Sequence, residues 1–361
     1  MRTASLLMWS LASIAVAATK PPYPPSPRIR EAKFDFSTLG RRAPGSDNWP
    51  LTWADDDHQY TAWGDGGGFG GTNRDGRVGL GIARVEGPAD AYRGVNVWGG
   101  KNPEAPAAFP GKSYGILSVG GILYMWASPD PSPHLVEARL AKSADKGRSW
   151  QKAPWAFTFA DELTIPTFLQ FGKDYAGARD GYVYSYYIRP RWGPGRATVP
   201  AQLAGFDVHK PGEVYLSRVP RERLLDRAAC EFFAGLDDRG APRWASDLAA
   251  KRPVFADPAG VGWNLSVLYN PGLRRYLLAT EHSRTSRGCM GLFDAPEPWG
   301  PWTTVLYNDA WGEGHVPLTA FRFNFSPKWL SADGRRFTFV FTGVGENDAW
   351  NTLRGEFILA P

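Results

Sequence analysis

The chain has 361 residues, a formal net charge of +5 and 43% hydrophobic residues. This length supports a large core in one domain of repeating units or in two smaller domains. Lysine and arginine are spread along the chain without the basic run that follows a phosphate backbone, so we expect no nucleic-acid binding. The many Trp and Tyr residues suit both a core and carbohydrate stacking.

The first predicted element is a secretory signal peptide over residues 1–17. Arg2 precedes an apolar run, 6–16, which is too short to span a bilayer and ends in a small-x-small cleavage pattern. Residues 18–29 include the Pro-rich stretch KPPYPPSPR and should form a stiff extended leader. No later segment has 18 uninterrupted apolar residues. We therefore expect a secreted, monomeric protein with no membrane insertion.

Residues 30–361 are predicted to form one all-β domain, a five-bladed β-propeller. Short runs alternate apolar and polar residues between turns, and five segments repeat an aromatic-rich strand, a tight Asp, Asn or Gly turn and a second strand. A third strand candidate follows each hairpin. The hairpins are WPLTWADDDHQYTAWGD (49–65), YGILSVGGILYMWAS (114–128), TFLQFGKDYAGARDGYVYSYY (167–187), NLSVLYNPGLRRYLLAT (264–280) and FRFNFSPKWLSADGRRFTFVFTG (321–343).

Three further segments bear on this architecture. REAKFDF, 30–36, is an early strand that would complete the last blade and close the ring. SADKGRSW, 143–150, fits the Asp-box turn, which resembles the turns on the outside of sialidase-type propeller blades. The clearest helical candidate is 220–236. A β-sandwich plus a barrel is the alternative architecture.

The propeller hypothesis separates the acidic residues by position. Asp56, Asp57, Asp180 and Asp333 fall in hairpin turns and are predicted to be structural. At the opposite face, acids converge with Trp, Arg and Asn, which suits a glycosidase because it needs one carboxyl to protonate a leaving oxygen and another to attack or activate water. The candidates at that face include Asp47, Asp65, Tyr114, Asp130, His134, Asp161, Glu162, Arg189, Arg191, Trp263, Asn264, Glu281, His282, Arg284, Asn324, Glu346, Asn347 and Asp348.

The first hairpin brings two of these acids together. With Asp56 and Asp57 at the turn, Asn48 should face Asp65, and Asp47 is then a diagonal neighbour of Asp65. Side chains at that offset lie roughly 5 to 8 Å apart, which fits the carboxylate pairs of both retaining and inverting enzymes. Asp65 has a second interpretation as a backbone cap of the following GDGGG turn.

We expect no cofactor, with structural Ca²⁺ near the channel acids as an open alternative. The five His residues are isolated and show no zinc-ligand spacing. GDGGGFGG lacks the Lys-Ser/Thr of a nucleotide-binding loop, and no Gly-x-Ser-x-Gly element of a serine hydrolase is present. Cys230 and Cys289 could form a disulfide or remain two buried thiols.

Several segments carry a family resemblance: SDNWPLTWADDDHQYTAWGDGGGF, GKSYGILSVGGILYMW, PTFLQFGKDYAGARDGYVY, DAPEPWGPWTTV and NFSPKWLSADGRRFTFVFTG. Over most of residues 40–360 the chain resembles a family of secreted five-bladed propellers catalogued as a domain of unknown function. Some relatives are grouped with endo-D-arabinanases, which cut the α-linked D-arabinofuranose chains of mycobacterial-type cell walls. The resemblance implies that Asp47 matches the acid that similar glycosidases use as base or nucleophile. It leaves Asp65, Glu162 and Glu281 as contenders for the general acid.

The sequence thus predicts a glycoside hydrolase that acts on a polysaccharide, with Asp47 as base or nucleophile and Glu162 or Asp65 as acid. A polysaccharide lyase is the first alternative, with His134, His282 or Tyr114 as base and Arg189 or Arg191 neutralising a uronate. A carbohydrate-binding propeller without catalysis is the second. The predicted substrate-binding residues are Trp49, Tyr114, His134, Arg189, Trp263, Asn264, Glu281, His282 and Asn324.

Overall fold

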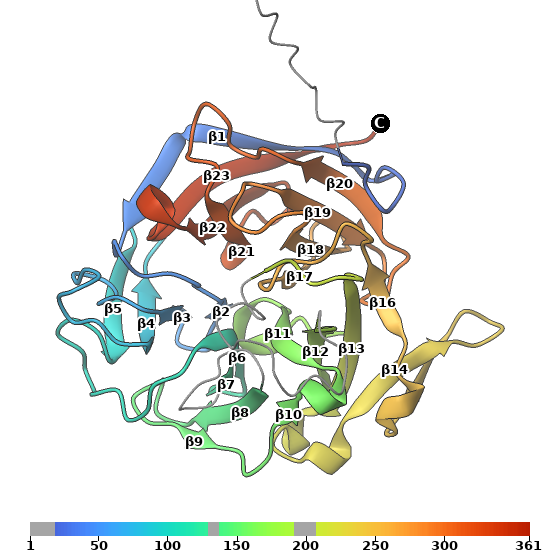
Figure 1. Ribbon diagram of the computed structural model, residues 1–361, viewed down its shortest axis with the longest axis horizontal. Helices are drawn as coiled ribbons and strands as arrows, with labels where there is room; N and C mark the ends of the chain where they lie inside the picture. Colours follow the sequence, from blue (N-terminus) through green and yellow to red (C-terminus); the bar gives the residue numbers. More distant parts are fainter. Residues whose placement is uncertain (1–18, 129–136, 191–206) are drawn as a thin grey trace, which may run out of the picture.

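The computed structural model describes residues 19–128, 137–190 and 207–361. These ranges consist of strands, loops and six short 3-10 helices without an α-helix, so the predicted all-β class is confirmed. No helix in them is long and apolar enough to cross a membrane. The sheets are arranged around a common centre (Figure 1). The 3-10 helices are Phe159–Asp161, Lys173–Tyr175, Arg221–Arg223, Arg227–Ala229, Leu248–Ala250 and Gly345–Asn347.

The strands form four sheets in the described part of the chain. The first contains β2 (Leu51–Trp53), β3 (Gln59–Gly64), β4 (Leu80–Glu86) and β5 (Arg93–Trp98). The second contains β6 (Ser113–Val119), β7 (Ile122–Ala127), β8 (Glu137–Ser143), β9 (Gln151–Lys152) and β10 (Phe157–Thr158). The third contains β11 (Thr164–Gln170), β12 (Tyr182–Ile188), β13 (Glu213–Pro220), β14 (Glu231–Leu236), β15 (Pro242–Ala245), β16 (Pro253–Ala256), β17 (Ser266–Asn270), β18 (Arg275–Glu281), β19 (Met290–Ala295) and β20 (Thr303–Asn308). The fourth contains β21 (Ala320–Leu330), β22 (Arg336–Gly343), β23 (Trp350–Leu359) and β1 (Ile29–Arg42).

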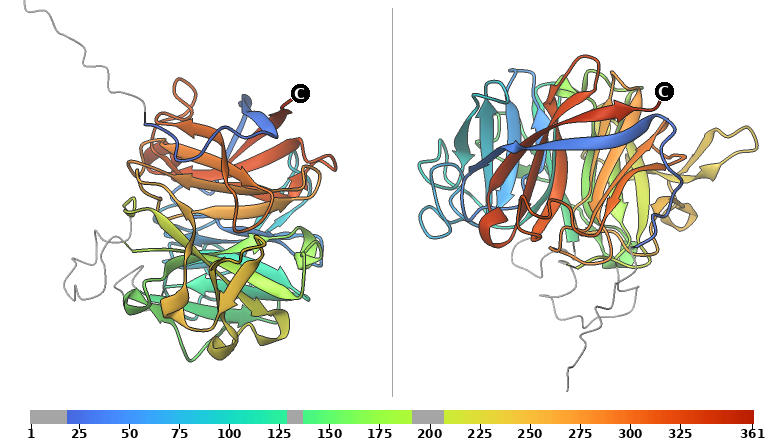
Figure 2. Two further views of the ribbon diagram at one scale, coloured as in Figure 1. Left: turned by 90° about the vertical axis from the view of Figure 1, so that its right-hand side faces the viewer. Right: turned by 90° about the horizontal axis from the view of Figure 1, so that it is seen from above.

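The third sheet is two antiparallel units joined by one parallel strand pair. Leu169 and Gln170 of β11 pair in parallel with Val267 and Leu268 of β17, whereas all the other strand pairs of this sheet are antiparallel. The innermost strands contact one another in a closed order, β2 to β6, β6 to β11, β11 to β17, β17 to β21 and β21 back to β2. Seen from the side, strands run through the thickness of the molecule, so that turns collect at its two ends (Figure 2).

The five predicted hairpins are present, and each is followed by its predicted third strand. Their turns lie at one end of the molecule, which we call the hairpin end. Turn acids there are structural, as predicted. Asp56 accepts from the His58 N–H at 3.1 Å and the Tyr60 hydroxyl at 2.7 Å. Asp180 repeats this pattern with the Tyr182 N–H and the Tyr184 hydroxyl. We call the opposite end, where β2, β6, β11, β17 and β21 begin, the open end.

The two ends of the chain meet in the fourth sheet. β1 pairs antiparallel with β23, from Ile29 against Leu359 to Arg42 against Trp350, so the predicted early strand does complete the last sheet. The leader before β1 also docks: the Tyr23 hydroxyl accepts from the Ala256 N–H at 2.8 Å. The fourth sheet is therefore closed by backbone hydrogen bonds between residues that are remote in sequence.

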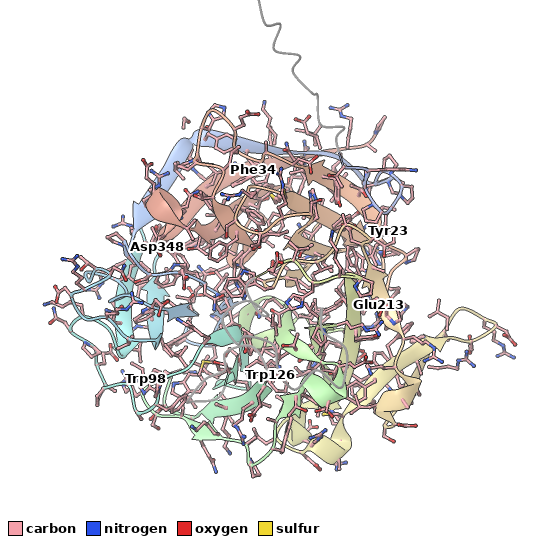
Figure 3. All side chains as sticks on the ribbon, viewed as in Figure 1. Tyr23, Phe34, Trp98, Trp126, Glu213 and Asp348 are labelled. Carbon is pink, nitrogen blue, oxygen red and sulfur yellow. The ribbon has the colours of Figure 1, made fainter. Side chains whose placement is uncertain are left out.

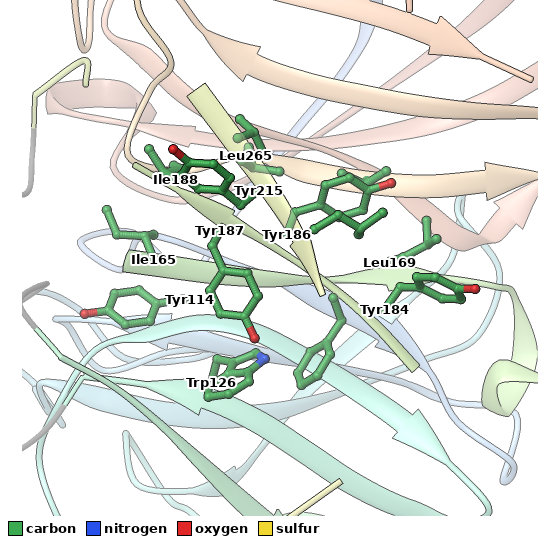
Figure 4. Close-up of a cluster of buried hydrophobic side chains, with 14 of the residues drawn as sticks. Tyr114, Trp126, Ile165, Leu169, Tyr184, Tyr186, Tyr187, Ile188, Tyr215 and Leu265 are labelled. Atoms are coloured by element: carbon green, nitrogen blue, oxygen red, sulfur yellow. The ribbon is translucent and has the colours of Figure 1, made fainter. Parts of the chain in front are cut away.

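Aromatic side chains fill the spaces between neighbouring sheets. Between the second and third sheets, Trp126 stacks on Phe168 with ring centroids 6.0 Å apart and donates to the Ser185 hydroxyl at 3.2 Å. Figure 4 shows Trp126 beside Tyr187, whose ring meets it edge to face. Between the first and fourth sheets, Trp49 meets Trp350 edge to face at 5.3 Å. Such rings bury large apolar areas and fix how adjacent sheets are oriented.

The helix expected over residues 220–236 is not formed. The segment makes two 3-10 turns and then β14, in which Phe232 pairs with Ser217 of β13. The Asp226 carboxylate accepts from the Ala228 N–H at 2.9 Å and holds the second turn. The helical pattern was misleading because Phe232 and Phe233 are buried from a strand rather than from a helix face.

The Asp-box turn gives a stability prediction. The Asp145 carboxylate accepts three hydrogen bonds, from the Ser143 hydroxyl and from the N–H and hydroxyl of Ser149. We expect Asp145→Ala to lower the free energy of unfolding by about 1 to 2 kcal/mol, because these donors lose their acceptor. Urea denaturation would measure this, with exposed Asp238→Ala as the near-neutral control. Equal stability of the two variants would contradict the structural role of the turn.

Candidate functional site

Asp47 is held at the open end by a short antiparallel bridge to the end of β3. Its N–H donates to the Gly64 carbonyl at 3.0 Å, and the Gly64 N–H donates back to the Asp47 carbonyl at 2.9 Å. Since Asp47 rather than Asn48 pairs here, the predicted facing of Asn48 and Asp65 is wrong. The Asn48 side chain instead donates to the Ser113 carbonyl, which ties this loop to the second sheet.

Two cations and a second acid surround this point. Nζ of Lys112 lies 2.6 Å from Oδ1 of Asp65, so the two groups form a close ion pair. The angle between them is not that of a hydrogen bond. Arg77 approaches the same Asp65 oxygen at 3.2 Å. A methyl group added to Gly64 would lie 2.9 Å from Oδ1 of Asp47 and 3.3 Å from Nζ of Lys112. Asp47 and Lys112 therefore both lie near the same point above Gly64, while the ion pair of Lys112 is with Asp65.

The acids of this group have different electrostatic surroundings. Burial raises the pKa of Asp47 to about 7; Lys112 opposes this rise, and the charges of Asp65 and Asp348 add to it. Burial also raises the pKa of Asp348, with a contribution from Asp65. Asp65 faces Lys112 and Arg77 directly and forms an ion pair with each of them. Asp47 and Asp348, in contrast, have no ion pair within the described residues.

Arg322 of β21 supplies a buried cation beside this group. Its guanidinium donates to the Asn264 side-chain oxygen at 2.6 Å and to the Tyr114 carbonyl at 2.8 Å. Burial lowers the pKa of Arg322, and the negative charge of Asp47 opposes that shift. Arg322 thus joins the ends of β6, β17 and β21 next to Asp47. The sequence carries a signal for Arg322, because it stands within the aromatic run FRFNF and a buried charge must be paired.

Glu162 and Arg189 belong to a separate group in the third sheet. Glu162 lies 3.4 Å from Arg189 and 3.5 Å from Lys251. Arg189 also contacts Glu213 at 2.7 Å, and Tyr215 donates to that same carboxylate. Figure 3 places Asp348 and Glu213 on opposite sides of the centre. The predicted pairing of Asp47 with Glu162 is therefore not supported, whereas that of Asp47 with Asp65 is.

The other predicted substrate-binding residues occupy different places. Trp49 is fully buried in the core and has no exposed ring face for a sugar. The Tyr114 ring is also buried, and its hydroxyl donates to the Glu137 carbonyl at 3.4 Å. Trp263 packs on Phe321 with centroids 5.3 Å apart. The Asn324 side chain donates to the Trp49 carbonyl at 3.4 Å. Three other candidates, His134, Asp130 and Arg191, lie outside the described residues.

Glu281 and His282 are enclosed at the end of β18. The Glu281 carboxyl accepts from the Ser286 N–H at 2.6 Å, and burial raises its pKa to about 8. The His282 ring is stacked on Tyr307 with centroids 3.7 Å apart. Neither side chain is exposed at the open end. A hollow of about 930 Å³ lies along the outer strands β1 and β23, and Asp47 does not line it.

The charges around Asp47 predict how its carboxyl titrates. Lys112→Met should raise the pKa of Asp47 above about 7, because a cation that favours the carboxylate is lost. Asp348→Asn should lower it, because a like charge is lost. Carboxyl ¹³C NMR of labelled aspartate would follow both shifts, with Asp333→Asn at the hairpin end as the control. Shifts in the same direction for the first two variants would contradict the arrangement.

Comparisons with known proteins agree with the fold. No curated protein matches the chain. A candidate hydrolase from Bacteroides ovatus ATCC 8483 is similar in structure, with a TM-score of 0.53 and 12% identity over 89% of this chain and 87% of that one. A GH43_1 enzyme from Xanthomonas citri gives a TM-score of 0.48 and 14% identity over 87% and 90% of the two chains. The α-L-arabinofuranosidase PaAbf62A from Podospora anserina gives 0.48 and 11% over 94% and 99%.

At these identities the similarity concerns the fold and not the activity. The sequence itself gives the family, because the model of a domain of unknown function, DUF4185, matches residues 115–311, more than half of the chain. These residues cover β6 to β20, from the second sheet to the end of the third. The chain belongs to the DUF4185 family.

Proposed function

We propose that this chain is a secreted, monomeric five-bladed β-propeller that hydrolyses a polysaccharide, with D-arabinofuranose-containing cell-wall glycan as the first substrate to test. The closed order of contacts among β2, β6, β11, β17 and β21 supports five blades, with the third sheet counted as two. The family resemblance of the sequence supports the choice of glycan. The activity is argued from the group around Asp47.

One observation carries the proposed hydrolysis: Asp47 and Asp65 lie together but in different surroundings. Burial raises the pKa of the partly exposed Asp47 carboxyl to about 7, so this carboxyl can hold a proton at neutral pH. Asp65 is 41% exposed and forms ion pairs with Lys112 and Arg77. Two carboxyls that differ in this way are what an acid and a base or nucleophile require.

The proton held by Asp47 assigns the catalytic roles of the two acids. Asp47 donates a proton to the glycosidic oxygen as its bond to the anomeric carbon breaks. Asp65 attacks that carbon or takes a proton from the attacking water. This reverses the assignment expected from the sequence, in which Asp47 was base or nucleophile and Asp65 a contender for the acid. The reason is that Lys112 contacts Asp65 and only approaches Asp47.

Of the residues suggested for a lyase, His134 and Arg191 lie outside the described part of the chain, and the other three are less suitably placed. The Tyr114 and His282 side chains are buried. His282 bonds the Ser283 hydroxyl and the Asn308 carbonyl through its two ring nitrogens. Arg189 is paired with Glu162 and Glu213, so a uronate would have to displace both carboxylates.

Replacement of either acid should slow turnover strongly. Asp47→Asn and Asp65→Asn should each reduce hydrolysis by about 10²- to 10⁴-fold, because proton transfer or attack is lost. Release of reducing ends from arabinan, arabinogalactan and xylan would measure this. Asp56→Asn, in a turn at the hairpin end, should retain activity.

The fold of the Asp47→Asn variant provides an internal check. Because the folded pKa of Asp47 lies above its ordinary value of 3.8, the native state binds more protons and loses stability as pH rises between those values. Asn mimics the protonated form, so the variant should melt no lower than wild type at pH 8.

Wild-type rates in Asp47→Asn would refute the assignment. Products with a new C=C bond would indicate a lyase, and binding without turnover would indicate a carbohydrate-binding propeller.

The pH profile distinguishes the two role assignments. If Asp47 must be protonated, kcat/KM should fall on the alkaline side with a pKa near 7. Asp348→Asn should move this limb to lower pH, since removal of a nearby negative charge lowers the pKa of Asp47. If activity instead rises through pH 7 to a plateau, Asp47 acts as the base, as expected from the sequence.

A further inference from the structure

A second group of chemically reactive side chains lies in the third sheet, at the ends of three adjacent strands. His282 follows β18, Cys289 precedes β19 and Asp309 follows β20. The register aligns them, because Glu281 pairs with Met290, which in turn pairs with Asn308. The His282 N–H also donates to the Cys289 carbonyl at 3.2 Å. The sheet therefore gathers an imidazole, a thiol and a carboxylate that are scattered in the sequence.

The ligand atoms of these three residues lie within 4.8 Å of one another. Nδ1 of His282 is 3.8 Å from Oδ1 of Asp309, close to the spacing of two ligands on one tetrahedral metal ion. His282 and Cys289 are fully buried, while Asp309 is one-third exposed and provides a route to solvent. A metal ion would require the widest pair to close by about 1 Å.

Surrounding bonds orient the ring and the carboxylate as they do in metal centres. Nε2 of His282 lies 3.2 Å from the Asn308 carbonyl, which favours a proton on Nε2 and leaves the Nδ1 lone pair for a ligand. Tyr307 stacks on the ring at 3.7 Å and fixes its plane. The Thr19 N–H donates to Oδ2 of Asp309 at 2.9 Å, while the other carboxylate oxygen, Oδ1, faces Nδ1 of His282.

The present contacts of the ligand atoms are weak or replaceable. The Cys289 thiol reaches the Asp309 carbonyl at 3.5 Å, and the Ser283 hydroxyl lies 2.9 Å from Nδ1 of His282. The imidazole and the thiolate bind a metal ion in their deprotonated forms, so binding displaces the thiol proton of Cys289.

We propose that His282, Cys289 and Asp309 form a structural site for a borderline or soft divalent metal such as Zn²⁺. The thiolate and carboxylate neutralise the two charges of the ion, and the Ser283 hydroxyl or a water molecule completes four ligands. The thiolate and imidazole select against Ca²⁺ and Mg²⁺, which prefer oxygen ligands. Cys230 and Cys289 are separate free thiols, so no disulfide competes for Cys289. The isolated His residues of the sequence gave no indication of this site.

Titration of the purified, metal-stripped protein with Co²⁺ tests the site directly. We expect one equivalent to bind with a thiolate-to-cobalt absorption band and to be displaced by Zn²⁺. Cys289→Ser should lose the band, and both Cys289→Ser and Asp309→Asn should weaken Co²⁺ binding at least tenfold. Cys230→Ser is the matched control and should behave as wild type, because this thiol lies in a different part of the third sheet.

Three results would overturn the proposed metal site. Absence of stoichiometric Co²⁺ binding, or binding unchanged in both Cys289→Ser and Asp309→Asn, refutes the site. Equal affinity for Ca²⁺ and Co²⁺ also refutes it, because the thiolate would then not be a ligand. Circular dichroism on each variant establishes that a lost band does not come from unfolding. His282 is left unchanged because its ring packs on Tyr307 and its removal would disturb the core.

Discussion

The pairing of β1 with β23 is the constraint on which the candidate site depends. This pairing closes the fourth sheet with the first residues of the domain and sets that sheet against the first one. At their junction Trp350 packs on Trp49, and the Gly45 N–H donates to the Asp348 carbonyl at 2.7 Å. Asp47 and Asp348 can influence each other only because this junction is fixed, although some 300 residues separate them in sequence.

The charged side chains at the open end differ in how far they are exposed to solvent. Asp65 is 41% exposed and has two cations as partners, whereas Lys112, at 11% exposure, is much more enclosed. Arg322 is buried and Asp47 is partly buried, so solvent screens their charges less than it screens that of Asp65. A proton on Asp47 removes one negative charge from this group and thereby relieves the repulsion between the acids. The arrangement therefore couples the proton of one carboxyl to the charge of its neighbours.

The sequence was most informative where a local pattern fixes the structure. Alternation and turn residues predicted the hairpins, because a tight turn sets the pairing of the strands next to it. The register at Asp47 could not be predicted, since an additional bridge to Gly64 shifts the pairing beyond the regular hairpin. The 220–236 segment misled because its apolar spacing fits a helix as well as the turns and strand that it forms.

Side-chain environment was harder to predict than strand position. Asp47 and Asp65 were predicted to be neighbours because both flank one hairpin. Lys112 and Arg322 were missed, since their partners come from other sheets. Trp49 was assigned to substrate because the sequence does not distinguish a ring that faces solvent from one that packs between sheets. Glu162 lies at the expected end but in another ion-pair group.

The parallel pair between β11 and β17 affects how the molecule responds to stress. Other neighbouring units are held together mainly by side chains, but these two share backbone hydrogen bonds and form one continuous ladder. Local opening of one unit then breaks bonds of the other, so this half of the ring should fluctuate and melt cooperatively as a single body. The junction between the first and fourth sheets, which carries Asp47, has no such ladder and is held by the packing of Trp49 on Trp350 and by the hydrogen bond from Gly45 to Asp348.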